Sequence, residues 1–370
     1  MIKREVYTFS PGPCIFPMEV LEKTKAELND KKHHILEFDH NSPEVKQVIA
    51  DCKSRLRTLL KIPDNFSIIF MQGGATLQFA AVPLNLLKDS NSVGNYIVNG
   101  TWSDLALKEC LKFAKANKVN KNQQSKDFNY APKTNEADFD KNGAYLYYCD
   151  NETIHGVEFS QPPNSFGQNL VTDMTSNFLS KPIDFSKFGL VYSGAQKNWG
   201  PAGLCTVIIR NDLLSCKGME IMPSVFDYKK YKDTDSFYSL PPIFSLYVAR
   251  NNLDWIAQHG GVENMDKMAR QKAQILYDCV DNSKGFYRNN VAKDSRSRMN
   301  VIFIILNDHK ELTAKFVQES AKEGLIQLAG HRSVGGLRAS IYNGMPLEGV
   351  LKLRDFMERF RTKYQDTPKL

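Results

Sequence analysis

Residues 192–203 read YSGAQKNWGPAG and continue a short apolar run that begins at Leu190. One lysine, Lys197, follows this run and is enclosed by three glycines and a proline. A lysine held by tight turns at the end of a strand can be fixed in geometry and partly desolvated, which favours the neutral amine that Schiff-base chemistry requires. The alternative is a loop lysine beside a glycine-rich packing turn. The pattern makes Lys197 the first candidate for a reactive residue.

Similar short strands are predicted elsewhere along the chain. Each apolar run is closely followed by a glycine or an aspartate, and helical or polar segments separate the runs, which span 67–70, 95–98, 145–148, 170–172 and 190–193. This alternation is typical of an α/β fold with a mainly parallel sheet flanked by helices, in which ligands bind at the carboxyl ends of the strands. Apolar periodicity predicts helices over 17–32 and 43–60.

The last third of the chain has a different pattern. A long helix is predicted around 255–280, and then two strands and two helices follow at 299–306, 337–342, 309–322 and 346–364. This order indicates a smaller α+β domain whose boundary lies near residue 268. The polar stretch 115–143 is predicted to be an exposed excursion of the first domain.

Composition narrows the class of protein. The 370 residues include 48 basic and 41 acidic side chains, and the net charge is +7. Both signs are interleaved and no basic stripe is present, so we expect no nucleic-acid partner, whereas small anionic substrates fit the mild positive excess. Seven cysteines without C-x-x-C spacing indicate neither a disulfide framework nor a metal site, and a reducing cytoplasm is the expected compartment. No apolar run approaches the roughly 18 residues of a membrane span, so we expect no membrane partner.

Two more motifs fit a cofactor site around Lys197. Asp173 ends a predicted strand, where an aspartate is typical of a turn or a helix cap. Beside a Schiff-base lysine it has a second interpretation, because a pyridoxal ring needs a carboxylate to keep its nitrogen protonated. Gly73 and Gly74 form a turn that opens a helix, where free backbone N–H groups can bind phosphate, although such turns also serve close packing.

Further candidates follow other strand ends. Trp102 could cover one face of a cofactor ring, or it could be a core tryptophan. The hydroxyl group of Thr153 could bond a ring substituent, or the segment that contains it could be only a turn. Late in the chain, Arg332 and Arg338 flank a glycine turn beside His331, and two guanidinium groups could hold two anions of one substrate. A pair of surface arginines is the competing interpretation.

Together these motifs resemble the phosphoserine aminotransferase family, a member of the fold-type I pyridoxal-phosphate enzymes. The resemblance covers most of the chain, and its motifs are GP at 12–13, QGGATLQFAAVPLN at 72–85, NETI at 151–154, GAQKN at 194–198, RSRMN at 296–300, GHR at 330–332 and RASIYN at 338–343. It implies a large domain, 16–268, with a mainly parallel seven-stranded sheet sandwiched by helices. It also implies a small α+β domain formed by 1–15 and 269–370.

The resemblance assigns roles to the cofactor residues. Lys197 would bind pyridoxal 5′-phosphate covalently and carry protons, and Asp173 would pair with the ring nitrogen. Trp102 would stack on the ring, and Thr153 would contact its hydroxyl group. The remaining cofactor-binding residues would hold the phosphate: Ala75, Thr76 and Gln196, with Ser239 from a neighbouring subunit.

A substrate site and a homodimer with shared active sites are also implied. Arg338 would bind the substrate α-carboxylate, and the distal anion would be bound by His331 and Arg332, with His40 and Asn41 from the second subunit. Asn41 stands where the family carries arginine, and Ser239-Leu240 stands where it carries Asn-Thr. The implied reaction is the reversible transfer of an amino group from glutamate to 3-phosphohydroxypyruvate, giving phosphoserine and 2-oxoglutarate, as in serine biosynthesis.

Other functions stay open at this point. The same fold could serve another aminotransferase, or a cysteine desulfurase with a nucleophilic cysteine on a mobile loop. A nucleotide-binding oxidoreductase would need G-x-G-x-x-G spacing, which the Gly73-Gly74 turn lacks. The departures at Asn41 and Leu240 could also mark an inactive binding module that keeps the fold.

Overall fold

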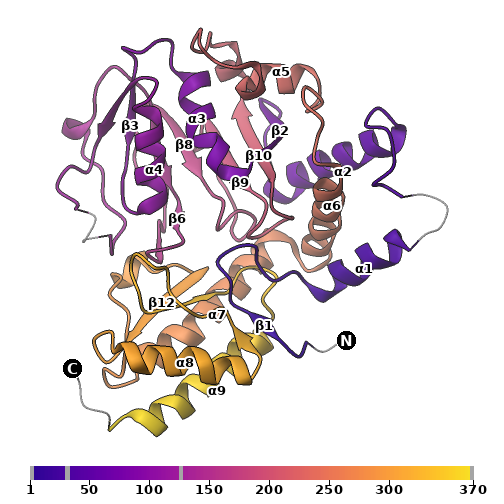
Figure 1. Cartoon of the computed structure of the whole chain (residues 1–370). Helices are drawn as coiled ribbons and strands as arrows, with labels where there is room; N and C mark the ends of the chain where they lie inside the picture. Colours follow the sequence, from indigo (N-terminus) through magenta and orange to yellow (C-terminus); the bar gives the residue numbers. More distant parts are fainter. Residues whose placement is uncertain (1–3, 30–33, 125–127, 367–370) are drawn as a thin grey trace.

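The computed structural model describes residues 4–29, 34–124 and 128–366. A larger α/β part lies above a smaller part in Figure 1, and segments from near both ends of the chain meet in the smaller part. Within the described ranges, every helix is too short or too polar to cross a lipid bilayer.

A seven-stranded sheet forms the centre of the larger part, with the strand order β2-β10-β9-β8-β5-β3-β4. Strand β10 runs antiparallel to both of its neighbours, and the other neighbouring pairs are parallel. The predicted mainly parallel seven-stranded sheet is therefore confirmed. Its strands are β2 (Phe66–Gln72), β3 (Val93–Tyr96), β4 (Lys115–Lys118), β5 (Gly143–Cys149), β8 (Asn169–Asp173), β9 (Leu190–Gly194) and β10 (Leu204–Arg210).

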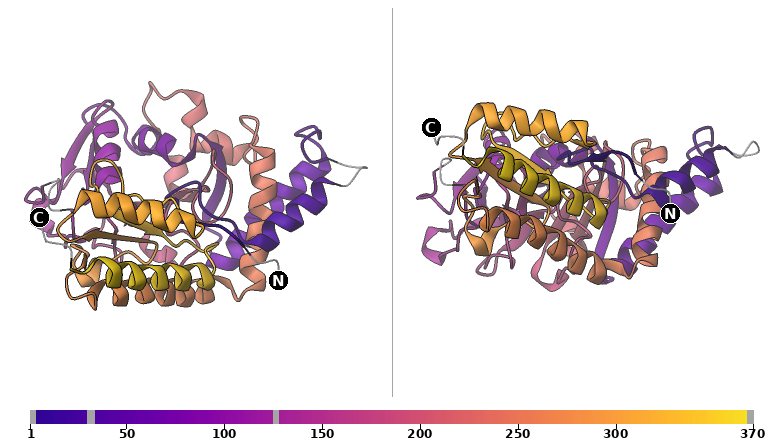
Figure 2. Two further views of the ribbon diagram at one scale, coloured as in Figure 1. Left: turned by 60° about the horizontal axis from the view of Figure 1, so that its bottom comes forward. Right: turned by 90° about the horizontal axis from the view of Figure 1, so that it is seen from below.

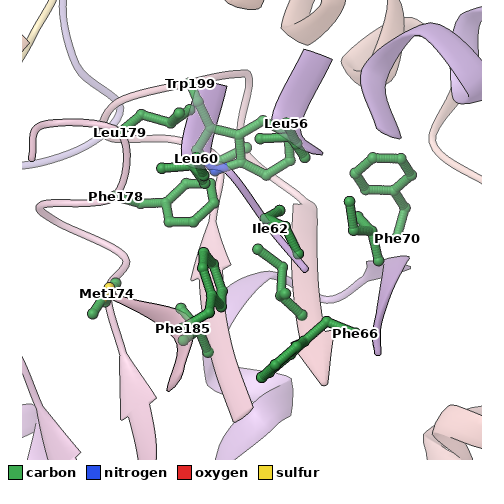
Figure 3. Packing of buried hydrophobic residues seen from close by; sticks show 14 of the residues in the cluster. Leu56, Leu60, Ile62, Phe66, Phe70, Met174, Phe178, Leu179, Phe185 and Trp199 are labelled. Atoms are coloured by element: carbon green, nitrogen blue, oxygen red, sulfur yellow. The ribbon is translucent and has the colours of Figure 1, made fainter. Parts of the chain in front are cut away.

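Apolar side chains cover both faces of this sheet. Along β10, Leu204 and Ile208 join one core cluster, while Val207 and Ile209 join the cluster on the opposite face, as the period of two in a strand requires. The first cluster includes Trp199, which packs among Phe178, Leu56 and Leu60 in Figure 3. Helices α2 (Pro43–Leu60) and α6 (Ile243–Gln258) cover the first face, and α1 (Met18–Leu28) packs on α6. Helices α3 (Gly74–Leu86), α4 (Thr101–Cys110) and α5 (Tyr228–Asp233) cover the second face.

The smaller part has an antiparallel sheet of β11 (Tyr287–Arg288), β12 (Asn300–Ile305) and β14 (Leu337–Ser340). Helices α7 (Gly261–Asp281), α8 (Lys310–Lys322) and α9 (Leu347–Tyr364) lie side by side in both views of Figure 2. Strand β1 (Tyr7–Thr8) pairs with β13 (Leu325–Ile326), so the start of the chain joins this core. The division near residue 268 stays a prediction, since α7 runs through that position without a break.

Two predictions about local structure were wrong. The helix predicted over 255–280 is two helices, because Gly260 and Gly261 adopt φ angles of 85° and 69°, which a continuing helix cannot accommodate. The stretch 115–143 is only partly an exposed excursion, because it begins with the edge strand β4 and buries Val119 and Gln123. The helix predicted over 17–32 ends at Leu28, and residues 30–32 lie outside the described residues.

Candidate active site

The carboxyl ends of the parallel strands bring the predicted cofactor residues to one edge of the sheet. Strand β8 ends at Asp173, β9 ends shortly before Lys197, and β5 is followed by a hairpin of β6 (Asn151–Glu152) and β7 (Val157–Glu158) that carries Thr153. One cavity lies at this edge. Seven of the eight predicted cofactor residues line it: Ala75, Thr76, Trp102, Thr153, Asp173, Gln196 and Lys197.

The side chain of Lys197 is buried inside this cavity, with 7% of the residue exposed. Its Nζ donates a hydrogen bond to Thr153 Oγ1 at 2.5 Å and lies 5.6 Å from the centroid of the Trp102 ring. Burial lowers the pKa of the Lys197 amine from 10.5 to about 8, and the nearby Asp173 carboxylate opposes this shift. A substantial fraction of the amine is therefore neutral near physiological pH, as a nucleophile requires.

Asp173 is oriented by two residues that the sequence analysis did not single out. Its Oδ1 accepts the backbone N–H of Thr175 at 2.8 Å, and the hydroxyl group of Tyr192 also bonds the carboxylate. Tyr192 is the neighbour of Asp173 on β9, and its hydroxyl group lies 2.7 Å from that of Tyr147. Burial raises the pKa of Asp173, whereas Thr175 and Lys197 lower it. The spacing of Asp173 and Thr175 is that of an Asx turn, a signal that the sequence offered.

The first turn of α3 forms one end of the cavity. Gly73 and Gly74 have φ angles of 90° and 62°, and this left-handed conformation turns the chain from β2 into α3. Ala75 and Thr76 follow in the first turn, where backbone N–H groups lack a helical acceptor. The side chain of Gln196 lines the same cavity, and its amide group offers N–H donors. This end of the cavity has the donors and the helix polarity that suit a phosphate group.

A second cavity of about 580 Å³ lies between the hairpin loop and the smaller part. It is lined by His155, Arg288, His331 and Arg338, and no carboxylate is among its described lining residues. Arg338 is 6% exposed and donates to the Thr153 carbonyl at 3.3 Å, while its Nε is buried without a partner among residues 4–29, 34–124 and 128–366. Burial lowers the pKa of His155 to about 4 and also lowers that of His331. The lowered pKa values favour neutral histidines, so the positive charge of the cavity comes from Arg288 and Arg338. These two guanidinium groups suit the cavity to an anionic ligand.

Four predicted site residues lie outside both cavities in the described chain. Arg332 is exposed in the same loop as His331. His40 and Asn41 precede α2 and bond each other at 3.0 Å between His40 Nε2 and Asn41 Nδ2. Ser239 is half-buried and hydrogen-bonded to Tyr231. For His40, Asn41 and Ser239, this placement is compatible with a contribution to a second subunit, which stays a prediction.

Known proteins are similar to this chain over nearly its whole length. The sequence profile of the aminotransferase class-V family matches residues 6–353. The chain is 44% identical to the phosphoserine aminotransferase of Desulfosudis oleivorans, and the match covers 97% of this chain and 99% of that protein. It is 43% identical to the chloroplastic phosphoserine aminotransferase 1 of Arabidopsis thaliana, covering 98% and 84%.

Solved structures agree in fold over both parts of the chain. Phosphoserine aminotransferase from Bacillus circulans subsp. alkalophilus is 39% identical with a TM-score of 0.91, and the match covers 97% of this chain and 99% of that one. The pyridoxal-phosphate-bound phosphoserine aminotransferase from Trichomonas vaginalis is 36% identical with a TM-score of 0.89, covering 95% and 99%. This chain belongs to the phosphoserine aminotransferase family of class-V aminotransferases.

Proposed function

We propose that this chain uses pyridoxal 5′-phosphate to transfer the amino group of glutamate to 3-phosphohydroxypyruvate, reversibly, yielding phosphoserine and 2-oxoglutarate. The observation that carries the proposal is the environment of Lys197. Its buried amine, with a pKa of about 8, shares one cavity with the Asp173 carboxylate and the Trp102 indole. An ordinary structural lysine would have a carboxylate or water at its amine rather than a threonine hydroxyl and an aromatic face.

The residues of this cavity fit the cofactor. Asp173 would face the ring nitrogen, Trp102 would cover the ring, and Thr153 would bond the ring hydroxyl group. Among the described residues, two buried polar atoms of the cavity wall, Trp102 Nε1 and Gln196 Oε1, have no hydrogen-bond partner, which suits a cavity that binds a polar ligand. The phosphate would be bound by the first turn of α3 together with the Gln196 side chain.

The cofactor, when bound, supplies an electron sink for the negative charge that develops at the substrate α-carbon. Lys197 Nζ would take the proton from that carbon and deliver it to the cofactor within the same half of the reaction. In the second half it would move a proton in the opposite direction, to the α-carbon of the new amino acid, acting as general base and general acid. Asp173, held by Thr175 and Tyr192, would keep a negative charge beside the ring nitrogen. The low pKa of Lys197 suits this role, because a general base works best when its pKa is near the working pH.

The second cavity would bind the substrate. The guanidinium group of Arg338 contacts Thr153 through one terminal nitrogen and hence lies beside the proposed cofactor ring, where an α-carboxylate must bind. Its Nε has no partner among the described residues and can donate to that carboxylate. His331 and Arg288 lie in the same cavity and can stabilise a second anion such as a phosphate. Arg332, in the same loop as His331, would need to turn its side chain inward to reach this group.

A homodimer would complete the site. Large apolar side chains are exposed along 221–244, and Ile221 (65%) and Leu240 (57%) are the most exposed of them. Such a concentration is typical of a protein interface. Ser239 lies within this segment, so pairing of two copies here would carry it towards the neighbouring cofactor site. Sedimentation velocity of the protein and of a Leu240→Asp variant tests this arrangement, and a monomeric parent protein would overturn it.

A cytoplasmic location is part of the proposal. All seven cysteines are free, and no two of them form a disulfide. Proteins that keep this many unpaired thiols are typical of reducing compartments.

Cysteine desulfuration is not favoured by the thiols near Lys197. Cys149 lines the cofactor cavity, but it ends a buried strand, and burial raises its pKa well above 9. Cys14 donates to the Lys197 carbonyl, and burial raises its pKa to about 12. Neither cysteine provides the accessible thiolate that this chemistry needs.

An absorption spectrum tests the proposed function. Protein mixed with pyridoxal phosphate should turn yellow, and glutamate and phosphoserine, added separately, should each bleach the colour. A Lys197→Ala control should not develop the same band. A protein that stays colourless would remove the enzyme proposal, and bleaching by glutamate alone would mean that Asn41 has redirected the substrate preference.

A further inference from the structure

A buried carboxylate lies directly behind the wall of the cofactor cavity. Glu152 is 0% exposed, and it is not among the residues that line the cavity. Its Oε2 accepts the backbone N–H of Trp102 at 3.0 Å, and its Oε1 accepts the N–H of Ser103 at 2.8 Å and the Ser103 hydroxyl at 2.6 Å. Both amides belong to the first turn of α4, which has no acceptors of its own for them. Glu152 thus caps α4 from a different element of the fold.

The chain between β3 and α4 is shaped around this carboxylate. Gly100 stands at the cap position of α4, and a Cβ atom there would collide with the carboxyl group of Glu152. The hydroxyl group of Ser103 also accepts the N–H groups of Asn99 and Gly100 at 3.1 and 3.2 Å. Burial raises the pKa of Glu152 to about 7, and the hydrogen bonds from Ser103 and Trp102 oppose this shift. The ionised form is also favoured because it faces the positive end of the helix dipole.

The same carboxylate connects two walls of the cavity. One wall is Trp102, and the other is Thr153, which directly follows Glu152 and accepts from both Lys197 and Arg338. Within the part of the chain that the structure describes, the indole N–H of Trp102 has no hydrogen-bond partner, so no protein hydrogen bond of its own orients the ring. The position of the indole therefore depends on the backbone of the first α4 turn, and Glu152 holds that backbone.

We propose that Glu152 is a positioning residue for the cofactor ring, which sets the Trp102 indole against the hairpin that carries Thr153. The part of this proposal that concerns the ring rests on the proposed function. Glu152 does not line the cavity, and it acts on the indole through the two amides that it binds. Its charge also weakly raises the pKa of Lys197, an effect that the position of the indole does not depend on. Replacing it with glutamine leaves one acceptor oxygen for the two amides, and the new amide N–H groups face donors.

The first experiment needs no cofactor. The chain has three tryptophans, so protein labelled with 5-fluorotryptophan gives three ¹⁹F resonances, and a Trp102→Phe variant assigns one of them. In the apoprotein, Glu152→Gln should shift or broaden the Trp102 resonance and leave that of Trp255 unchanged. Ser103→Ala removes one donor and keeps the carboxylate, so it should shift the Trp102 resonance by a smaller amount. This variant provides the test if Glu152→Gln does not fold.

The matched control is Asp104→Asn. Asp104 also carries a carboxylate in the first turn of α4, but it pairs with Lys108 at the surface at 2.6 Å. This variant removes the same charge from the same helix end without touching the Trp102 amide, so the Trp102 resonance should stay in place. A general loss of stability would change the Trp102 resonance in Glu152→Gln and in Asp104→Asn alike.

The second experiment measures the dissociation constant of pyridoxal phosphate. Loss of one hydrogen bond to a charged acceptor should weaken cofactor binding by about tenfold in Glu152→Gln, and Asp104→Asn should stay within about twofold. An unchanged Trp102 resonance in both Glu152→Gln and Ser103→Ala would overturn the positioning role, as would unchanged cofactor affinity in Glu152→Gln. A wild-type protein that binds no pyridoxal phosphate would instead overturn the proposed function, which the ¹⁹F comparison does not depend on.

Discussion

Replacing Lys197 with methionine should stabilise the apoprotein while abolishing transamination. The amine is buried, and its pKa falls from 10.5 to about 8, a shift equivalent to about 3 kcal/mol of unfavourable free energy for the charged form. That net figure already includes the attraction of Asp173. Loss of the hydrogen bond to Thr153 offsets about 1 kcal/mol of the gain. The free energy of unfolding should therefore rise by about 2 kcal/mol near neutral pH, since methionine has a similar length and no charge.

The pH dependence of this gain has a definite sign. Between pH 8 and 10.5 the folded protein holds a neutral amine and the unfolded chain a charged one, so the unfolded state binds more protons and wild-type stability rises with pH. The advantage of Lys197→Met is therefore full below about pH 8 and should fade as the pH approaches about 10.5.

Denaturant unfolding of the cofactor-free proteins at several pH values measures both effects. The control is Lys112→Met, since Lys112 is 64% exposed in a surface pair with Glu109, and its stability should change by less than about 0.5 kcal/mol. A Lys197→Met apoprotein that is less stable than wild type near neutral pH would refute the reasoning, as would a difference that does not change with pH.

Three further predictions concern the site itself. Asp173→Asn removes the charge beside the proposed ring nitrogen and keeps the side-chain shape, so kcat should fall at least about 100-fold, equivalent to about 2.7 kcal/mol, with a folded protein by circular dichroism. Arg338→Lys loses the forked guanidinium, so KM should rise about tenfold or more for both amino-acid substrates in steady-state assays. An unchanged KM would mean that the α-carboxylate binds elsewhere. The rate at which the apoprotein captures pyridoxal phosphate, measured by stopped-flow absorbance, should rise with pH, because only the neutral Lys197 amine reacts. The midpoint of this rise should lie at about pH 8, and a midpoint near 10.5 would contradict a desolvated lysine.

That the candidate cofactor residues lie close together could be predicted from the sequence, for a physical reason. Asp173, Thr153 and Lys197 follow apolar runs whose alternation with helices predicts a mainly parallel sheet, and parallel strands place their carboxyl ends at one edge. The contacts that orient these three residues could not be predicted from one sequence. Tyr192 meets Asp173 only through the register of β8 against β9, and Glu152 meets Trp102 only after the hairpin has folded onto α4.

The errors in the fold also have particular causes. Apolar periodicity continues across Gly260 and Gly261, so it joined α6 and α7 into one helix, although two consecutive glycines are a strong signal for a break. Strand β4 reads Lys-Ala-Asn-Lys, a polar sequence that pairs as the last strand of the sheet and has one strand neighbour. Edge strands of this kind lack the apolar alternation that reveals a buried strand. The antiparallel strand β10 was not predicted, although its sequence contains a run of β-branched residues.

The central claim is a preference for a phosphorylated 2-oxo acid, and one comparison tests it most directly. With glutamate as amino donor, kcat/KM would be measured for 3-phosphohydroxypyruvate and for hydroxypyruvate, which lacks only the phosphate. The cationic second cavity predicts a preference of at least about 100-fold for the phosphorylated substrate, because each charge-assisted hydrogen bond to the phosphate contributes about 1.5–3 kcal/mol. Equal values for the two substrates, or no turnover of either, would contradict the account.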